Sequence, residues 1–529
     1  MHKFIWLMVI GICRTAMAQS VYHPVESEQA YKQFKSQVMG YTFNGNDLSL
    51  NRFVRLSPMH KSNAYTIEVI ATKSSPLFKT FYHTPDRFYA INDTSGDWQL
   101  VVNPVFHFAS GKQGQQTIYR NTRGGEIFGQ IGGDKGIGFY TLFTENQERY
   151  PDAYMFAKDS MNYVPNEWFY KPFQKKGAVD FFQARAYVTF SAAKHYIKMQ
   201  FGHDKHKIGN GYRSLILSDF APQYLFFKIN TDVKRFHYQN LFTQFIDRGQ
   251  VQGNTLYPKK FGAFHRLSFD IRQNLQIGVN EMIMFDRSDS SLRNQFDLNY
   301  LNPVIFYRAV ESSMGSKDNS LMAMDAQWTV LHRYQLYGQF VLDEFKLDYI
   351  KNQPNWWANK YAYQIGARAF DMARIKHLDV LMEYNRVRPY TFSHGFPQQS
   401  FSHFNQALAH PLGSNFAEAL AQVKYHYKRW GIQWTASYAK MGRDSFLNGR
   451  NFGANILRSY DDQRVNDFSS TMFMGKLTQL SIHDVVLSYQ PSQHLSFDFR
   501  VNSRQTNGST TMWYTLGMRI NTALRQFNY

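Results

Sequence analysis

Apolar and polar residues alternate along much of the chain from Asp97 to the C-terminus. The segment 495–502 reads LSFDFRVN, and the segments 378–385 and 417–427 alternate in a similar way. Because successive side chains of a β-strand point to opposite faces, each segment has one apolar face and one mainly polar face. Strands in water-soluble sandwiches are usually about five or six residues long, whereas many of these runs reach about ten. That length crosses a bilayer when the strand is tilted.

The pattern recurs often enough to build a closed barrel. It predicts strands at residues 97–109, 118–131, 137–148, 181–191, 195–203, 223–231, 234–246, 261–271, 274–286, 319–331, 334–346, 360–371, 376–387, 417–428, 431–442, 476–490, 494–505 and 510–521. These make about eighteen strands, an even number within the range of bacterial outer-membrane barrels. We therefore predict an all-β fold, a transmembrane antiparallel β-barrel.

The connections between these segments alternate in length. Short turns near 272–273 and 429–430 contrast with long polar stretches such as 149–180, 287–318 and 443–475. Barrels have short periplasmic turns and long extracellular loops, whereas a sandwich has no reason to separate its loops by length. Loop length therefore favours the barrel over the sandwich.

Charged residues on the later predicted strands lie opposite the apolar set. They are Asp379, Glu383, Lys424, Asp498, Arg500 and Arg519. A charge at the bilayer midplane costs on the order of 2–4 kcal/mol, so we expect these side chains to line the lumen. On the last strand we expect the opposite set to face lipid, namely Met512, Tyr514, Leu516, Met518 and Ile520.

The N-terminus has the features of a secretory signal peptide. A short basic start precedes an apolar run from Phe4 to Cys13, and Ala16-Met17-Ala18 precedes Gln19. This arrangement predicts export and cleavage after Ala18. Lipidation of Cys13 is the alternative, although the bulky Ile12 stands where a small residue is expected.

The chain is thereby divided into a signal peptide at 1–18, an N-terminal periplasmic or plug segment at 19–95, and a barrel at 96–529. The second part has weak periodicity, with a possible short helix at 26–34. The chain ends in Phe527-Asn528-Tyr529. An aromatic C-terminus of this kind is commonly recognised by the outer-membrane assembly machinery, which we expect to be a partner.

Composition narrows the class of partner. Cys13 is the single cysteine, so the predicted mature chain has no disulfide, thiolate metal site or cysteine nucleophile. The formal net charge is +19 and aromatic residues make up 17% of the chain. The aromatic girdles of barrels account for the high aromatic content. The positive net charge suggests an acidic partner, which outside the cell means anionic polysaccharide or lipopolysaccharide and not nucleic acid.

Several segments resemble the capsule assembly (Wzi-type) family of outer-membrane proteins, most closely its Bacteroidota branch. The likeness lies in residues 123–127 (RGGEI), 138–140 (GFY), 202–204 (GHD), 209–215 (GNGYRSL), 301–308 (LNPVIFYR), 335–340 (QLYGQF), 383–390 (EYNRVRPY) and 408–413 (LAHPLG). The resemblance implies an eighteen-stranded barrel with a helical periplasmic portion that holds surface polysaccharide on the cell. In gliding-motility relatives it implies a role in adhesion or motility. No ligand-contact residue of the family can be transferred to this chain.

The first candidate glycan site is the predicted loop 149–180. Trp168 and Tyr170 stand beside Lys171, Lys175 and Lys176. Aromatic rings can stack on sugars while lysines pair with uronate or phosphate. Alternatively, these aromatics pack the loop onto itself or lie at the rim of the outer leaflet.

A second candidate is the glycine-rich segment 202–213, with His203, Asn210, Tyr212 and Arg213. Its polar side chains are donors suited to an acidic glycan. The same segment could instead fold into the barrel mouth as a constriction. Two histidines without a clear third ligand are weak evidence for a metal, so we expect none.

The third candidate is the loop 388–416, with Arg388, Tyr390, His394, His403 and His410. Loops on a rigid scaffold often carry function, although such histidines are more often neutral hydrogen-bonding residues than ligands.

These features together predict a function without catalysis. No spacing of Ser, His and Asp stands out as a catalytic arrangement, so we expect neither enzymatic activity nor a cofactor. The sequence predicts a barrel in the bacterial outer membrane, surrounded by lipid and lipopolysaccharide, that binds or anchors acidic surface polysaccharide. The alternative is a passive porin or solute channel, which polar, charged lumen residues would also suit.

Overall fold

A computed structural model gives the structure of the protein. It describes residues 22–23, 35, 38–39, 54–55, 89–92, 98–132, 136–155, 163–173, 177–193, 196–247, 256–287, 295–303, 306–316, 318–344, 346–444, 449–492 and 494–529. The predicted signal peptide and most of the predicted segment 19–95 lie outside these residues.

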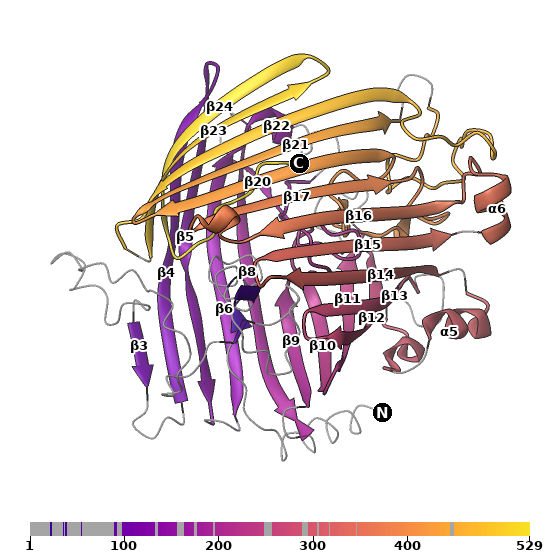
Figure 1. Ribbon diagram of the computed structural model, residues 1–529, viewed down its shortest axis with the longest axis horizontal. Helices are drawn as coiled ribbons and strands as arrows, with labels where there is room; N and C mark the ends of the chain where they lie inside the picture. Colours follow the sequence, from indigo (N-terminus) through magenta and orange to yellow (C-terminus); the bar gives the residue numbers. More distant parts are fainter. Residues whose placement is uncertain are drawn as a thin grey trace.

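Eighteen long strands of the described chain form a closed antiparallel barrel (Figure 1). They are β4 (Trp98–Gln113), β5 (Gln116–Ile131), β6 (Ile137–Arg149), β8 (Ala178–Ala192), β9 (Ile197–Asp204), β10 (Tyr224–Val233), β11 (Phe236–Ile246), β12 (Lys259–Arg272), β13 (Leu275–Phe285), β14 (Asn319–Val330), β15 (Tyr334–Glu344), β16 (Lys360–Ala369), β17 (Leu378–Val387), β20 (Phe416–Tyr427), β21 (Trp430–Arg443), β22 (Lys476–Tyr489), β23 (Leu495–Thr506) and β24 (Ser509–Ile520). Each overlaps one of the strands predicted from alternation, so the predicted fold class is confirmed.

The barrel closes where its last strand meets its first. Residues Tyr514–Ile520 of β24 pair with Phe106–Lys112 of β4. The short β3 (Tyr89–Asn92) pairs with Gln99–Val102, which is nearer the start of β4. With closure complete, the long strands leave no unpaired sheet edge, which is the condition for a sheet to cross a bilayer.

Connections of different length are segregated to the two ends of the barrel, as predicted. One end carries short turns, such as residues 234–235 and 428–429. The other end carries the long connections, including 205–223, 388–415 and 444–475. The tight turns at 114–115 and 507–508, beside the closing seam, also lie at this second end.

The two faces of the barrel wall differ as the alternation predicted. The outward side chains of Ile365, Met382 and Leu516 are largely exposed. The predicted lumen charges on the later strands are buried inside, apart from the half-buried Lys424. Arg519 pairs with Asp498 across the lumen face at 2.5 Å, and Arg500 pairs with Asp484 at 2.6 Å.

Exposed aromatic side chains follow the short-turn end of the barrel. They are Tyr196, Phe236, Trp328, Tyr427, Trp430 and Phe497. Such rings sit at the membrane–water interface of barrels, beside an apolar band about 25 Å tall. A closed barrel with an apolar outer wall and charged interior is an outer-membrane barrel, and the chain belongs in that membrane. None of the helices among the described residues is both long and apolar enough to span a bilayer.

The N-terminal segment contacts the barrel where it is described. Lys35, Val38 and Met39 are helical, just beyond the predicted helix at 26–34. The Lys35 ammonium lies 2.8 Å from the carboxylates of both Asp371 and Asp379, at the turn between β16 and β17. Val38 packs against Phe370. The segment therefore docks on the short-turn end.

A charge placed on the lipid face should destabilise the barrel. Ile365 is 65% exposed on the outer wall, whereas Leu331, 74% exposed, lies in a short turn. We expect Ile365→Arg to lower the free energy of unfolding in lipid vesicles by about 2–4 kcal/mol. Urea titration would measure this, with Leu331→Arg as the matched control expected near zero. Equal effects of the two variants would contradict the assignment of the lipid face.

Candidate functional site

The connection between β9 and β10, residues 205–223, folds into the lumen. The backbone amides of Tyr212 and Arg213 donate to the Glu383 carboxylate on β17 at 2.7 and 3.1 Å. Gly209 has a φ of 112°, and a Cβ there would collide with the Gln339 amide on the opposite wall. A side chain at this position would therefore strain the backbone and displace the Gln339 amide, where the loop lies against the wall. The constriction interpretation of this glycine-rich segment agrees with the geometry.

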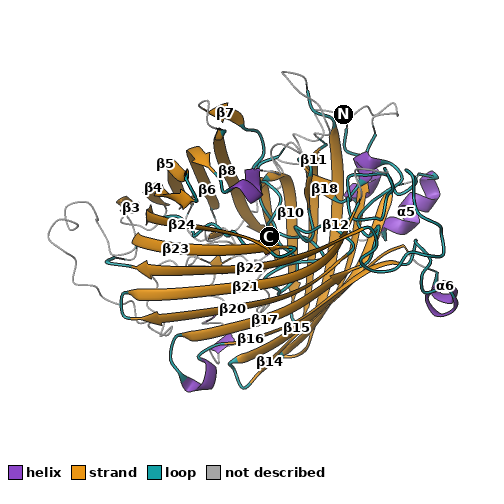
Figure 2. Ribbon diagram, turned by 90° about the horizontal axis from the view of Figure 1, so that it is seen from above, coloured by secondary structure: helices purple, strands orange, loops and turns teal. Residues whose placement is uncertain are grey.

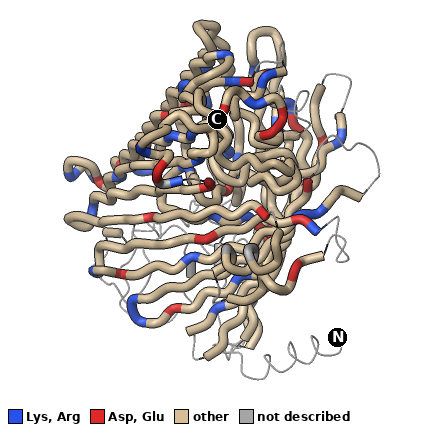
Figure 3. Tube along the Cα trace, turned by 90° about the vertical axis from the view of Figure 1, so that its right-hand side faces the viewer, with Lys and Arg blue, Asp and Glu red and all other residues tan. Residues whose placement is uncertain are grey.

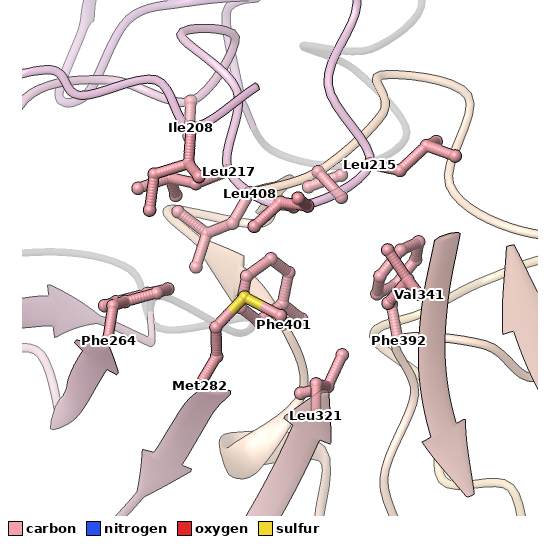
Figure 4. Close-up of a cluster of buried hydrophobic side chains, with 14 of the residues drawn as sticks. Ile208, Leu215, Leu217, Phe264, Met282, Leu321, Val341, Phe392, Phe401 and Leu408 are labelled. Atoms are coloured by element: carbon pink, nitrogen blue, oxygen red, sulfur yellow. The ribbon is translucent and has the colours of Figure 1, made fainter. Parts of the chain in front are cut away.

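A second long connection, 388–415, packs on the first. The Ser218 amide donates to the Leu408 carbonyl at 2.7 Å. Apolar side chains from both connections meet apolar side chains of the wall, so that a hydrophobic core lies inside the barrel (Figure 4). Among its members are Leu215, Leu217, Phe264, Met282, Leu321, Val341, Phe392, Phe401 and Leu408. An interior built in this way resembles a protein core more than a channel wall.

The C-terminal tail, residues 521–529, enters the lumen after the last strand ends at Ile520 (Figure 2). Arg525 pairs with Glu148 at 3.1 Å and with Glu167 at 2.8 Å. Asn502 donates to the Phe527 carbonyl at 3.1 Å. The Phe527 ring packs against Trp513 of β24 and against Tyr150 and Tyr154 of the connection after β6. The tail thus joins the barrel wall to a long connection.

Arg213 links these parts. Its guanidinium lies 3.3 Å from the Glu418 carboxylate on β20 and donates to the carbonyl and side chain of Asn528 in the tail. Glu418 is also bonded to His410 at 2.7 Å and to the Ser437 hydroxyl at 2.7 Å. Two long connections, the tail and the wall therefore meet around one buried carboxylate.

Most of the predicted glycan-binding residues have protein partners in this interior. Asn210, Arg213, Arg388, Tyr390, His394, His403 and His410 are buried, and Tyr212 is half-buried. Arg388 donates to the carbonyls of Asn359 and Ser470, and the Tyr390 hydroxyl donates to the Asn451 carbonyl. Such side chains fix the long connections in place, and a polymer outside the barrel does not reach them in this arrangement.

The remaining predicted residues lie near the outer surface. Lys171 is exposed, and Trp168 and Tyr170 are half-buried. His203 faces outward from β9, with its ring centroid 5.2 Å from that of Trp168. Lys175 and Lys176 lie outside the described residues. The structure brings the Trp168 and His203 rings together near the outer surface.

Burial keeps two of the predicted histidines neutral. Burial lowers the pKa of His394 to about 4 and that of His403 to about 3. The His403 Nδ1 accepts from the Ile246 amide at 2.9 Å, and its Nε2 lies 3.2 Å from the Gln223 carbonyl. Neither ring supplies positive charge for an acidic ligand at neutral pH. Among the described residues, no three His, Cys, Asp or Glu side chains are grouped to hold a metal ion.

An aromatic and cationic cluster at the long-loop end was missed by the sequence analysis. We name Lys346, Tyr349, Trp356, Trp357, Arg464 and Phe468 the rim cluster. The Lys346 ammonium lies 5.0 Å from the Tyr349 ring centroid and 5.2 Å from that of Trp356. Phe468 is 51% exposed. Basic and acidic residues are interspersed on this side of the molecule (Figure 3).

Backbone hydrogen bonds join the two connections that form the rim cluster. Its residues come from the connection after β15, which includes α6 (Leu347–Asn352), and from the connection after β21. The Trp357 amide donates to the Asp467 carbonyl at 2.8 Å, and the Ser470 amide donates to the Asn355 carbonyl at 2.9 Å. The Arg464 guanidinium lies 3.9 Å from the Trp357 ring centroid. The adjacent tryptophans near Lys346 could have indicated this cluster from the sequence. The contact with the connection after β21 could not be seen there.

Removing the cation at the centre of the lumen should be costly. Arg213→Met leaves Glu418 buried without its arginine, so we expect unfolding free energy to fall by about 3 kcal/mol. The pair of Arg458 and Asp462, 2.6 Å apart in the long connection after β21, offers a control outside the barrel wall. Arg458→Met should cost less than about 1 kcal/mol. Chemical denaturation in detergent measures both, and a small loss for Arg213→Met would count against a central role.

Acid should loosen the connection 388–415. The unfolded chain protonates His403 near pH 6.5, whereas the folded chain does so near its lowered pKa, so stability present above pH 6.5 is lost as pH falls. At pH 5 the loss is about 2 kcal/mol. Hydrogen exchange, corrected for intrinsic rates, should report weaker protection of 388–415 at pH 5 than at pH 7. His403→Gln, which can keep both hydrogen bonds, should reduce the difference; unchanged pH dependence would refute the assignment.

The chain is similar to solved structures, but the comparisons show no family to which it belongs. No family model matches the chain, and no curated protein matches it. Among solved structures it is similar to Escherichia coli Wzi, described as a carbohydrate-binding barrel involved in group 1 capsule assembly, at 13% identity and a TM-score of 0.49 over 81% of this chain and 85% of that one. It is also similar to Pseudomonas aeruginosa OpdK with vanillate, at 8% identity and a TM-score of 0.45 over 80% and 98%. It is similar as well to P. aeruginosa OprD, at 9% identity and a TM-score of 0.42 over 79% of this chain and 94% of that one. At these values the comparisons do not distinguish glycan binding from solute transport.

Proposed function

We propose that the protein is a non-catalytic outer-membrane barrel that binds acidic surface polysaccharide at its long-loop end and holds it on the cell. The observation that carries this proposal is the rim cluster, a partly exposed aromatic and cationic surface above a lumen that the chain itself fills. The resemblance of several sequence segments to capsule assembly proteins points in the same direction.

The rim cluster has the chemistry that a sugar polymer needs. The exposed Phe468 ring and the half-buried Tyr349 and Trp356 rings are apolar surfaces on which sugar rings can stack. Lys346 is exposed beside them and its ammonium lies over the Tyr349 and Trp356 rings, where it can meet a uronate or phosphate of a stacked sugar. The exposed Lys171 of the first predicted loop would add a second cation at the same end.

A passive solute channel is the second candidate function. Its support is the large number of charged side chains inside the barrel, such as Arg120, Arg185 and Arg266. Each of these is paired by the chain itself: with Glu148 at 2.9 Å, with Asp204 at 2.5 Å and with Asp325 at 2.7 Å. Charges that are already neutralised guide a passing solute less well, which favours attachment over transport.

The remaining partners follow from the same proposal. Outer-leaflet lipid and lipopolysaccharide would surround the wall, and an adhesion or gliding role would be a consequence of polysaccharide attachment. The C-terminal aromatics Phe527 and Tyr529 lie within the folded barrel. Recognition of them by the outer-membrane assembly machinery would therefore precede folding.

Binding to purified polysaccharides tests the proposal. We expect detergent-solubilised protein to bind polygalacturonate more tightly than neutral dextran. Replacing Lys346 and Trp356 together by Ala should weaken polygalacturonate binding about five- to tenfold, or about 1 kcal/mol or slightly more. The control replaces Tyr427 and Lys428, a cation–aromatic pair 5.3 Å apart at the short-turn end, and should leave binding unchanged.

The same proposal predicts a cellular phenotype. Cells that lack the protein should synthesise the normal total amount of surface polysaccharide but release it into the medium. Quantifying cell-bound and free polysaccharide after centrifugation measures this. Unchanged retention, together with no preference for polygalacturonate, would refute polysaccharide attachment.

A further inference from the structure

Three polar side chains form a row on the outer wall of the barrel. Asn240 of β11 is opposite His265 of β12, which is opposite Glu281 of β13. On each strand the residues directly before and after these three point into the lumen, because successive side chains alternate between the two faces. For example, Arg266 and Asn280 both reach Asp325 inside the lumen. The row therefore faces outward, against the inside–outside pattern that holds for the later strands.

This row lies at the depth of the hydrocarbon region. β13 begins at Leu275, beside the short turn 273–274, and Glu281 is farther along it. At ~3.3 Å per residue and a tilt of about 40°, Glu281 is about 15 Å above Leu275 along the membrane normal. That height falls within an apolar band about 25 Å tall. Immediately below, the outward Leu267 and Val279 are exposed, as lipid-facing side chains should be.

The connection after β13 covers the polar row. We name its described residues 295–303 and 306–316 the wall flap; it contains η3 (Leu298–Leu301) and α5 (Tyr307–Met314). The Tyr307 amide donates to the Glu281 carboxylate at 2.9 Å, and its ring centroid lies 3.9 Å from that of His265. Asn240 donates to the Pro303 carbonyl at 3.0 Å. The flap therefore gives hydrogen-bond partners to Asn240 and Glu281 and covers the His265 ring with the Tyr307 ring.

Apolar packing and an ion cluster fasten the flap to the wall. Its buried side chains join outward-facing residues of β10 to β13 in one hydrophobic cluster. The members include Phe227, Phe242, Phe261, Ala263, Ile283, Phe285, Phe296, Tyr300, Tyr307 and Val310. Arg287 pairs with Asp297 at 3.1 Å and with Asp318 at 2.8 Å, which joins the two ends of the connection. In Figure 1, α5 lies beside the long-loop ends of β12 and β13.

The side of the flap turned away from the wall is partly apolar. Leu298 is 61% exposed, Leu301 43% and Phe306 77%. The wall that the flap covers would otherwise face the outer leaflet, and the exposed residues below it continue the lipid-facing surface. Continuity with that surface identifies the occupant of this apolar face as lipid.

We propose that the wall flap is an intramembrane element whose outer face, Leu298, Leu301 and Phe306, contacts the acyl chains of the outer leaflet. It seals the row of Asn240, His265 and Glu281 from lipid and replaces the apolar surface of the strands that it covers. The inference is independent of polysaccharide binding.

Site-directed spin labelling tests this placement, because the chain has a single cysteine, Cys13, that can be replaced by Ser. In that background, Phe306→Cys and Leu298→Cys are labelled with a nitroxide and reconstituted in phosphatidylethanolamine–phosphatidylglycerol vesicles. Val279→Cys is the lipid-facing reference, and Phe468→Cys is the water-exposed reference at the long-loop end. A heat-modifiable band on gels confirms folding of each variant.

The measurement compares relaxation by oxygen, which partitions into lipid, with relaxation by a water-soluble nickel chelate. We expect the labels at positions 306 and 298 to favour oxygen, as the label at 279 does. Labels that favour the nickel chelate, as at 468, would overturn the proposal by placing the flap in water. Spin–spin broadening with low access to both reagents would also overturn it, because a second copy of the chain would then cover this face.

Discussion

Closure of the backbone ladder between β24 and β4 is the constraint on which the rest of the structure depends. In a bilayer each backbone N–H and C=O must be bonded within the protein, and an open sheet edge at membrane depth is excluded. The pairing of Tyr514–Ile520 with Phe106–Lys112 meets that condition. Once the sheet is closed, the alternation of side chains places one set against lipid and the other inside.

The inward set is strongly polar, and the protein satisfies it mainly with its own chain. The connection 205–223, the connection 388–415 and the C-terminal tail bring partners to the wall, with Arg213 and Arg525 forming ion pairs deep inside. A buried charge without a partner is expensive, and a paired one is tolerated. Buried charges in the lumen are thus paired within the chain, as in the interior of a globular protein, although a membrane surrounds the barrel.

The strands could be predicted from the sequence because a period of two is a local signal, and each predicted strand overlaps an observed one. The lumen charges on the later strands followed from the cost of exposing charge to lipid. The surroundings of Arg213, His403 and His410 could not be predicted, because they depend on which loops fold inward. The sequence around a basic or aromatic loop residue does not show whether its side chain faces solvent or the lumen.

Two further features depend on contacts between distant parts of the chain. Outward-facing Glu281 breaks the pattern of β13, and its carboxylate accepts a hydrogen bond from the Tyr307 amide of the flap. The rim cluster needs Arg464 and Phe468 from one connection beside Trp356 and Trp357 from another. In both cases the contact between the two distant parts has no local sequence signature.

The most direct test of a lumen filled by its own chain is electrical. In planar bilayers we expect the full-length protein to be nearly silent, whereas a variant that ends at Asn521, and so lacks the tail that anchors Arg213 and Glu148, should show discrete conductance steps. Steady conductance of the full-length protein, equal to that of the truncated variant, would contradict the account and favour a passive channel.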